Sequence, residues 1–256
     1  METTNQAFVQ SSTTDNVTTI TFFHPQSNSL PGNILNALAD EITKEGKNPN
    51  AAVIVLQSAG NKSFCAGASF DELLQINDEK TGLEFFSGFA KVINAMRLCP
   101  KFIVARIQGK CVGGGVGLAA SADYAIAVNT AEVKLSELAV GIGPFVVGPA
   151  VQRKIGLSAF STLAIDATNW RSAQWAFEKG LFSELHDSIE KVDESVAKIA
   201  KTLSGSNPEA MEDLKRICWE GTENWDKLLP ERAAISGRLI LSDFSRKSIE
   251  KFKAKK

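Results

Sequence analysis

The chain has 256 residues, of which 44% are hydrophobic and 22% charged, and its formal net charge at pH 7 is -1. This balance is typical of a globular protein with enough apolar side chains for a core, and it excludes a disordered, collagen-like or coiled-coil chain. A near-neutral chain has no overall electrostatic bias toward nucleic acid or an anionic membrane. We therefore expect neither nucleic acid nor a membrane among its partners.

The location of the protein is also indicated by composition. No apolar run approaches the roughly 20 residues of a membrane helix, and the polar start of the chain lacks the basic flank and apolar stretch of a signal peptide. The sequence therefore predicts a cytoplasmic protein. The four cysteines show no Cys-x-x-Cys spacing and mostly lie in apolar stretches, so we expect buried, reduced thiols at Cys65, Cys99, Cys111 and Cys218.

The sequence has few residues that could form a metal site or a catalytic triad. Its two histidines, His24 and His186, have no other strong ligand at metal-binding spacing. A histidine zinc site or a Ser-His triad would need such neighbours. We expect no metal.

Strand and helix patterns alternate through the first half of the chain. Apolar and β-branched runs predict strands at 17–23, 52–56 and 102–107. Helical spacing of apolar residues follows each of them, at 31–46, 86–96 and 113–122. This alternation predicts an α/β architecture in which the loops at the strand ends build the functional site.

The strand patterns stop after Ile189. Three amphipathic helices are predicted beyond it, at 192–203, 209–219 and 230–241, and the basic tail at 246–256 is expected to be a solvated helix end. We therefore divide the chain into a core with the site, residues 1–195, and a C-terminal helical region, residues 196–256.

A glycine-rich stretch begins the third helix. The unpaired N–H groups at a helix start stabilise negative charge. The pattern Gly115-x-Gly117-x-x-Ala120, with Glu137 twenty residues beyond Gly117, is a variant of the dinucleotide-binding fingerprint. However, it lies in the middle of the chain, and Glu137 does not end a clear hydrophobic strand, so a nucleotide site is the weaker interpretation.

A second small-residue turn, at 63–73, also follows a buried strand and leads into a helical pattern. Two such turns could each aim one backbone N–H at a single carbonyl oxygen, as in an oxyanion hole. The alternative is that both are tight helix starts that pack closely for steric reasons.

Three motifs carry a family resemblance. They are Phe64-Cys65-Ala66-Gly67-Ala68, Ile107-Gln108-Gly109-x-x-x-Gly113-Gly114-Gly115 and Ser136-Glu137-Leu138-x-Val140-Gly141. In this order and spacing they resemble the crotonase (enoyl-CoA hydratase/isomerase) superfamily, and weaker matches at Asn28 and at 170–181 extend the resemblance over most of the chain.

The resemblance implies a fold, a substrate and an assembly. The fold would be an α/β spiral of repeated β-β-α units with a C-terminal helical trimerisation region, in a homotrimer or a dimer of trimers. An acyl-CoA thioester would bind between the two small-residue turns, and there would be no cofactor because coenzyme A is part of the substrate. The apolar residues of the C-terminal helices, including Ile217, Trp219, Trp225 and Leu229, fit a region that packs against a further surface.

Carried over by position, the resemblance also implies site residues. Glu137 would be the catalytic carboxylate, and the N–H groups of Ala68 and Gly114 would hold the thioester oxygen. The remaining substrate-binding positions would be Ser27, Ala66, Gly67, Phe70, Gly113, Gly115, Gly117 and Lys251. Lys251 would reach the CoA phosphates, or else it is a solvated lysine.

The sequence departs from the pattern of many hydratases at one position. Gly117 stands where they carry a second catalytic glutamate. A single base favours double-bond isomerisation, which needs no activated water. Residues 113–118 and 136–147 are nevertheless similar to bacterial methylglutaconyl-CoA hydratases, which also have glycine there and whose substrate has its own carboxylate. We therefore expect an enoyl-CoA hydratase, with an isomerase, a lyase or decarboxylase, or a non-catalytic CoA-thioester-binding protein as alternatives.

Overall fold

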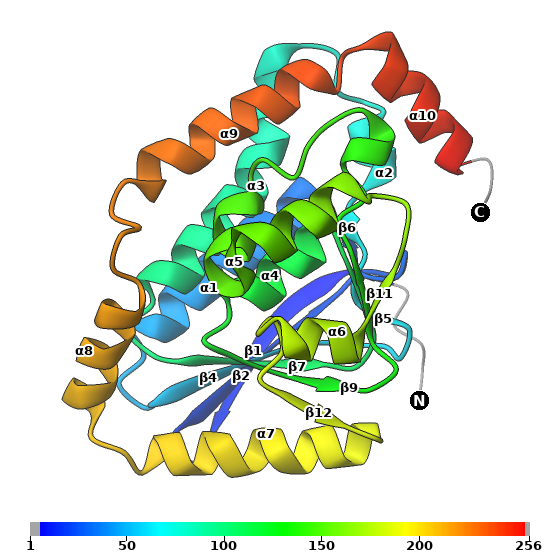
Figure 1. The fold of residues 1–256 in the computed structure, drawn as a ribbon. Coiled ribbons are helices and arrows are strands. Elements are labelled where there is room, and N and C mark those ends of the chain that lie inside the picture. Colours follow the sequence, from blue (N-terminus) through cyan, green and yellow to red (C-terminus); the bar gives the residue numbers. More distant parts are fainter. Residues whose placement is uncertain (1–5, 254–256) are drawn as a thin grey trace.

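The computed structural model describes residues 6–253, with side chains as far as Lys251 (Figure 1). A six-stranded sheet forms its centre, and all neighbouring strands in it are parallel except the first pair. Its strands, in spatial order, are β1 (Phe8–Thr14), β2 (Val17–Phe23), β4 (Val53–Ser58), β7 (Ile103–Ile107), β9 (Tyr124–Val128) and β12 (Glu184–His186). Strand β1 was not predicted. It pairs with β2 through a two-residue turn at Asp15 and Asn16, which both have positive φ, as such hairpins require.

Two smaller sheets stand beside the central one. The four-stranded sheet contains, in spatial order, β11 (Arg171–Ser172), β10 (Glu132–Lys134), β8 (Lys110–Val112) and β5 (Ser63–Cys65). A parallel pair is formed by β3 (Ser29–Leu30) and β6 (Gly67–Ala68).

The chain repeats one unit along the sheet. A strand of the central sheet is followed by a strand of the four-stranded sheet and then by a helix. The order is β4, β5 and α3 (Glu79–Leu98), then β7, β8 and α4 (Gly114–Ser121), then β9, β10 and α5 (Gly148–Ile165). The predicted spiral of β-β-α units is thus confirmed.

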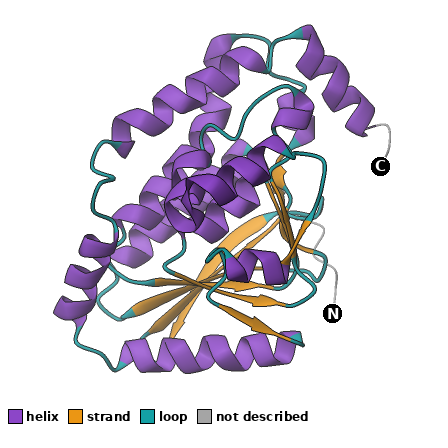
Figure 2. Cartoon of the chain, in the orientation of Figure 1, coloured by secondary structure: helices purple, strands orange, loops and turns teal. Residues whose placement is uncertain are grey.

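The helices form two unequal layers. In Figure 2, α1 (Gly32–Gly46), α3, α4 and α5 lie on one side of the central sheet and α7 (Ile189–Ser204) lies along the other side. The expected apolar stripe of α1 is buried, with Leu35, Leu38 and Ile42 inaccessible to solvent. Short helices occur at α2 (Phe70–Leu73), at the 3-10 helix η1 (Leu138–Val140) and at α6 (Ala173–Glu178).

The C-terminal helices are α8 (Pro208–Cys218), α9 (Trp225–Leu239) and α10 (Asp243–Lys253), and they pack on the same chain. The expectation that a helix starts at Pro230 was wrong, because α9 starts at Trp225 and contains Pro230. The indole of Trp225 packs edge-to-face against Trp219 with ring centroids 5.9 Å apart, which anchors the early start. Helix α9 lies along α3, where Gly237 faces Gly82 so closely that a Cβ on Gly82 would lie 2.7 Å from the Gly237 Cα.

The structure differs from the sequence-based expectations at the domain boundary and at one cysteine. The division at 195/196 falls inside α7, which packs on β4, β7 and β9, so α7 belongs with the core by its contacts. Three cysteines are buried as expected, whereas the expectation was wrong for Cys218, which is exposed because it lies on the solvent side of α8. Among residues 6–253, no helix combines the length and apolar character that crossing a membrane requires.

Candidate active site

One cavity of about 300 Å³ gathers most of the expected site residues. It lies where β6, the start of α4 and the segment after β10 meet. Its wall includes Ser27, Ala66, Gly67, Ala68, Phe70, Gly113, Gly114 and Glu137. The structure therefore brings together residues that are up to 110 positions apart in the sequence, from Ser27 to Glu137.

The two small-residue turns lie against each other in this cavity. Gly67 has a φ of 83°, and a Cβ there would lie 2.9 Å from the Val112 carbonyl oxygen and 3.5 Å from the Gly114 nitrogen. Only glycine allows this conformation and this approach. Gly114 is the first residue of α4, so its N–H has no acceptor within the helix. The two turns thus adjoin each other at the start of α4.

Two buried amides hold the loops that carry the first turn. Asn28 donates to the carbonyl oxygens of Ala59 at 2.9 Å and Ser63 at 3.0 Å, and its Oδ1 accepts from the His24 N–H at 2.8 Å. Gln108 donates to the Ser58 hydroxyl at 2.7 Å. Since most buried polar groups are hydrogen-bonded, these contacts fix the start of β5 and the turn beyond it.

Glu137 lies directly over the second turn. A Cβ on Gly113 would be 2.9 Å from Glu137 Oε1, and Gly113 has a φ of 51°. Glu137 Oε2 is buried and has no hydrogen-bond partner. Burial in these surroundings raises the pKa of Glu137 to about 7, since the charged form loses its hydration. The carboxyl group can therefore accept or give a proton near neutral pH.

The rest of the wall is largely apolar. Its hydrophobic members include Leu73, Phe86, Phe89, Val140, Ile142, Phe145, Val146 and Val147. Glu137 is the one carboxyl group among the described residues that line the cavity. Such a wall suits a short hydrocarbon chain beside a single acid-base group.

Three expected site residues lie outside this wall. Gly115 packs beneath it, where a Cβ would lie 2.2 Å from the Cys65 carbonyl oxygen, and at Gly117 a Cβ would lie 2.5 Å from Val147 Cγ1. Both glycines thus serve packing, and Val147 occupies the space into which a longer side chain at 117 would project. Lys251 is exposed on α10 and does not line the cavity, so its role with CoA stays a prediction.

The cavity also contains residues that sequence reasoning missed. Lys110, Lys134 and Trp170 line it beside the four-stranded sheet, and Ser136 lies next to Glu137. The polar residues Lys134 and Ser136 on either side of the buried Leu135 were the available signal, because residues two apart in an extended segment point to the same side.

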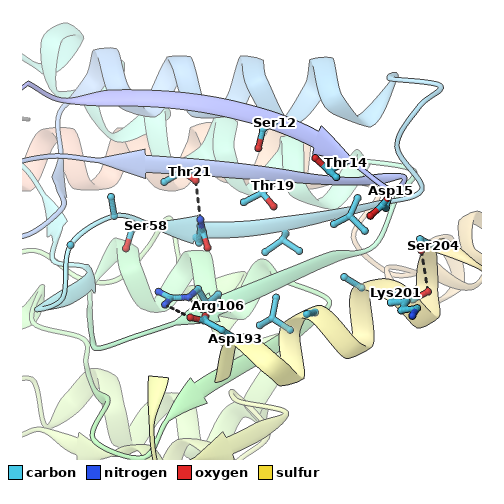
Figure 3. A pocket seen from close by; sticks show the side chains of 18 residues that line it. Ser12, Thr14, Asp15, Thr19, Thr21, Ser58, Arg106, Asp193, Lys201 and Ser204 are labelled. Carbon is cyan, nitrogen blue, oxygen red and sulfur yellow. Dashed lines mark hydrogen bonds and ion pairs between the residues drawn. The ribbon is translucent and has the colours of Figure 1, made fainter. Parts of the chain in front are cut away.

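A larger cavity, of about 1020 Å³, lies on the other side of the central sheet, beside α7 (Figure 3). Its polar groups pair with one another: Arg106 Nη2 lies 3.0 Å from Asp193 Oδ2, and Gln57 donates to the Thr21 hydroxyl at 3.1 Å. None of the expected catalytic residues lines it. We therefore place the candidate active site in the smaller cavity.

Comparison with known proteins identifies the family to which this chain belongs. The family model described as enoyl-CoA hydratase/isomerase matches residues 12–256. The chain is 27% identical over 195 residues to the (7aS)-7a-methyl-1,5-dioxo-2,3,5,6,7,7a-hexahydro-1H-indene-carboxyl-CoA hydrolase of Rhodococcus jostii. This alignment covers 75% of this chain and 73% of the relative. It is 26% identical over 209 residues to the short-chain-enoyl-CoA hydratase of Clostridium acetobutylicum, in an alignment that covers 81% of this chain and 79% of the relative.

A solved structure shows the same fold. The enoyl-CoA hydratase from Bacillus halodurans superimposes with a TM-score of 0.87 at 21% identity, and the match covers 95% of this chain and 99% of that one. Because the family model spans almost the whole chain and the α/β spiral agrees with it, this protein belongs to the enoyl-CoA hydratase/isomerase family of acyl-CoA enzymes, with the crotonase fold.

Proposed function

We propose that the protein hydrates a short-chain 2-enoyl-CoA thioester, with Glu137 as its acid-base group. One observation carries this proposal: the carboxyl of Glu137, whose Oε2 is buried without a hydrogen-bond partner, lies over the start of α4, beside two adjoining backbone turns. A raised pKa of about 7 allows this group to work in both directions at neutral pH. The mostly apolar cavity of about 300 Å³ supports a short acyl chain.

The two turns would stabilise the charge that develops on the thioester oxygen. Attack at the β-carbon moves an electron pair toward this oxygen and gives an enolate. The N–H groups of Ala68 and Gly114 would donate to the enolate oxygen in a site that excludes most water. Removing one such donor typically slows an enzyme by about 10²- to 10³-fold.

One carboxyl group is enough for the proton transfers of a hydration. The Glu137 carboxylate accepts a proton from water while the water oxygen bonds to the β-carbon. The carboxylic acid so formed then gives its proton to the α-carbon of the enolate, which restores the thioester carbonyl and the carboxylate. The net change is addition of one water across the double bond, and both new bonds form on the face where Glu137 lies.

Two similarities support hydration in spite of Gly117. As inferred from the sequence alone, segments 113–118 and 136–147 resemble methylglutaconyl-CoA hydratases, which also carry glycine at this position. The relative from Clostridium acetobutylicum is a short-chain-enoyl-CoA hydratase. A branched acyl chain with its own carboxylate, as in 3-methylglutaconyl-CoA, is therefore one substrate to test.

Double-bond isomerisation is the second candidate, and the single carboxyl group in the wall favours it. Glu137 would take a proton from the α-carbon of a 3-enoyl-CoA and return it to the γ-carbon of the dienolate so formed, whose oxygen the N–H groups of Ala68 and Gly114 would hold. No water would be consumed. The two reactions differ in the mass of the product, so they can be separated directly.

The test is incubation with crotonyl-CoA, 3-hexenoyl-CoA and 3-methylglutaconyl-CoA, followed by mass spectrometry and ultraviolet absorbance. A product heavier by one water, with loss of the conjugated absorbance, supports hydration. An unchanged mass with a gain of conjugated absorbance from 3-hexenoyl-CoA replaces hydration by isomerisation. Release of free CoA indicates hydrolysis and contradicts both, and so does the absence of turnover with all three esters.

A further inference from the structure

Two lysines share one tryptophan in the wall of the active-site cavity. Lys110 Nζ lies 4.4 Å and Lys134 Nζ lies 4.2 Å from the centroid of the Trp170 ring. All three residues line the same cavity as Glu137. We call these three residues the lysine–tryptophan cluster.

The strand register explains why the cluster forms beside the catalytic elements. Strands β8 and β10 are parallel neighbours, with Lys134 opposite Val112. Val112 directly precedes the turn at Gly113 and Gly114, and the Gly113 N–H donates to the Lys134 carbonyl oxygen at 2.8 Å. Lys134 is also only three residues before Glu137. A group bound at the cluster would therefore belong to the molecule that occupies the active site.

The lysine–tryptophan cluster and the neighbouring Glu132 together carry more positive than negative charge. Lys110 forms an ion pair with Glu132 at 3.0 Å, in which both side chains are more than one-third exposed. Lys134 takes part in none of the ion pairs found among the described residues. The face of an indole ring attracts ammonium groups but does not neutralise them. One ammonium group is thus left without a carboxylate partner.

The electrostatic surroundings of Lys134 agree with this excess of positive charge. Partial burial and then the nearby charge of Lys110 lower its pKa, while Glu132 acts in the opposite direction. Two cations at one ring repel each other, and an anion between them would relieve that repulsion. Carboxylate and phosphate oxygens are the usual partners of a lysine ammonium group.

We propose that Lys110, Lys134 and Trp170 form a subsite that binds an anionic group carried by the thioester substrate, either a carboxylate on its acyl chain or a phosphate of its CoA part. This inference rests on the proposal that an acyl-CoA occupies the cavity. It extends that proposal, because it assigns a substrate-binding role to three residues that were not among the expected site residues. Lys134 supplies the uncompensated charge, and Trp170 holds both ammonium groups in place.

The test measures binding of saturated esters, which have no double bond to hydrate, by isothermal titration calorimetry. Butyryl-CoA and glutaryl-CoA differ chiefly by a terminal carboxylate, and butyryl-pantetheine has no phosphate. The variants are Lys110→Met and Lys134→Met, which remove the charge and keep an unbranched side chain, together with Lys134→Arg, which keeps the charge. Lys62→Met is the matched control, because Lys62 is exposed just before β5 and does not line the cavity.

We expect Lys134→Met to weaken binding by about tenfold or more, the size of one charge-assisted hydrogen bond, and we expect Lys134→Arg and Lys62→Met to bind as the wild type does. A loss confined to glutaryl-CoA assigns the anion to the acyl chain. An equal loss for both CoA esters, with butyryl-pantetheine unaffected, assigns it to a CoA phosphate.

Two results would overturn the subsite. One is unchanged binding of both CoA esters in Lys110→Met and Lys134→Met. The other is an equal loss for butyryl-pantetheine, which would mean that packing and not charge was removed. Since these ligands do not react, a failure here leaves the hydration proposal standing, and a failure of hydration leaves this measurement interpretable.

Discussion

The Glu137 side chain is held in an environment that disfavours its charge. Its Oε2 is buried without a partner, and Oε1 lies over Gly113. A carboxyl group kept this way destabilises the ionised fold and gains reactivity as a base.

Replacing the carboxyl by an amide should separate binding from turnover. We expect Glu137→Gln to lower kcat by at least about 10²-fold, since general acid-base catalysis contributes about 10²- to 10⁴-fold. Binding of a saturated CoA ester should change little because the amide has nearly the same shape. Steady-state kinetics and calorimetry on the same preparation check both parts. Wild-type turnover in the variant would remove Glu137 from the mechanism.

The pH dependence should report the raised pKa of Glu137. The carboxylate is the form that accepts the proton of water, so kcat/KM should rise with pH and level off above a midpoint of about 7. At pH 5 the rate should be roughly a hundredfold below the plateau, because about one molecule in a hundred is then ionised. The control is recovery of full activity after return from pH 5 to pH 8. A midpoint near 4.5, the ordinary value for glutamate, would contradict the burial argument.

At the scale of elements, helix α8 is fastened to the core by one buried cation. Lys215 is 2% exposed, and its ammonium group donates to the Lys101 carbonyl oxygen at 2.7 Å and to Asp123 Oδ2 at 2.9 Å. Asp123 Oδ1 also accepts from the Trp219 indole at 3.0 Å. The network joins α8 to the loop before β7 and to the start of β9.

Removing this cation should destabilise the fold strongly. We expect Lys215→Ala to lower the free energy of unfolding by about 3–5 kcal/mol, since Asp123 would stay buried without its charged partner. Arg216→Ala is the matched control on the same helix, because its pair with Asp213 is mostly exposed and should contribute at most about 1 kcal/mol. Urea unfolding followed by circular dichroism measures both. Equal losses in the two variants would show that the buried network has no special weight.

Some elements could be predicted from sequence and others could not. The strands at 17–23 and 102–107 and the helix at 31–46 have long apolar patterns, and the structure confirms them within a few residues. Strands β3, β5, β6 and β8 have two or three residues, too few to show a period, and tertiary pairing alone forms them.

The site, too, could be predicted from the sequence only in part. Its motif residues could be named because they match a family pattern, whereas the approach of Glu137 to Gly113 depends on the fold. The lysine–tryptophan cluster had no sequence signal as a group. Lys110 and Lys134 are separated by a helix and a strand, and only the parallel pairing of β8 and β10 brings them to one ring.

At the scale of the whole molecule, the chain covers part of the apolar surface that was attributed to subunit contacts. Trp219, Trp225 and Leu229 are buried within the single chain. Other apolar side chains stay in solvent: Ile165 is 73% exposed on α5, and Phe244 is 64% exposed on α10. Scattered exposed residues are ordinary, but large ones on helices beside the site suit an interface.

We predict that the protein is a homotrimer or a dimer of trimers in solution. The exposed apolar residues on α5 and α10 would be removed from water in such an assembly, and α10 contacts η1, which follows Glu137, so the interface would lie near the active site. Light scattering after size-exclusion chromatography should give three or six times the 27.6 kDa of one chain. Turnover per wild-type chain should fall on dilution as the assembly dissociates. Addition of the inactive Glu137→Gln variant should then restore the turnover of the wild-type chains, because the two proteins form mixed trimers. A stable mass of one chain, with full turnover at that mass, would refute the assembly and leave the intrachain packing of α8, α9 and α10 as their complete structural role.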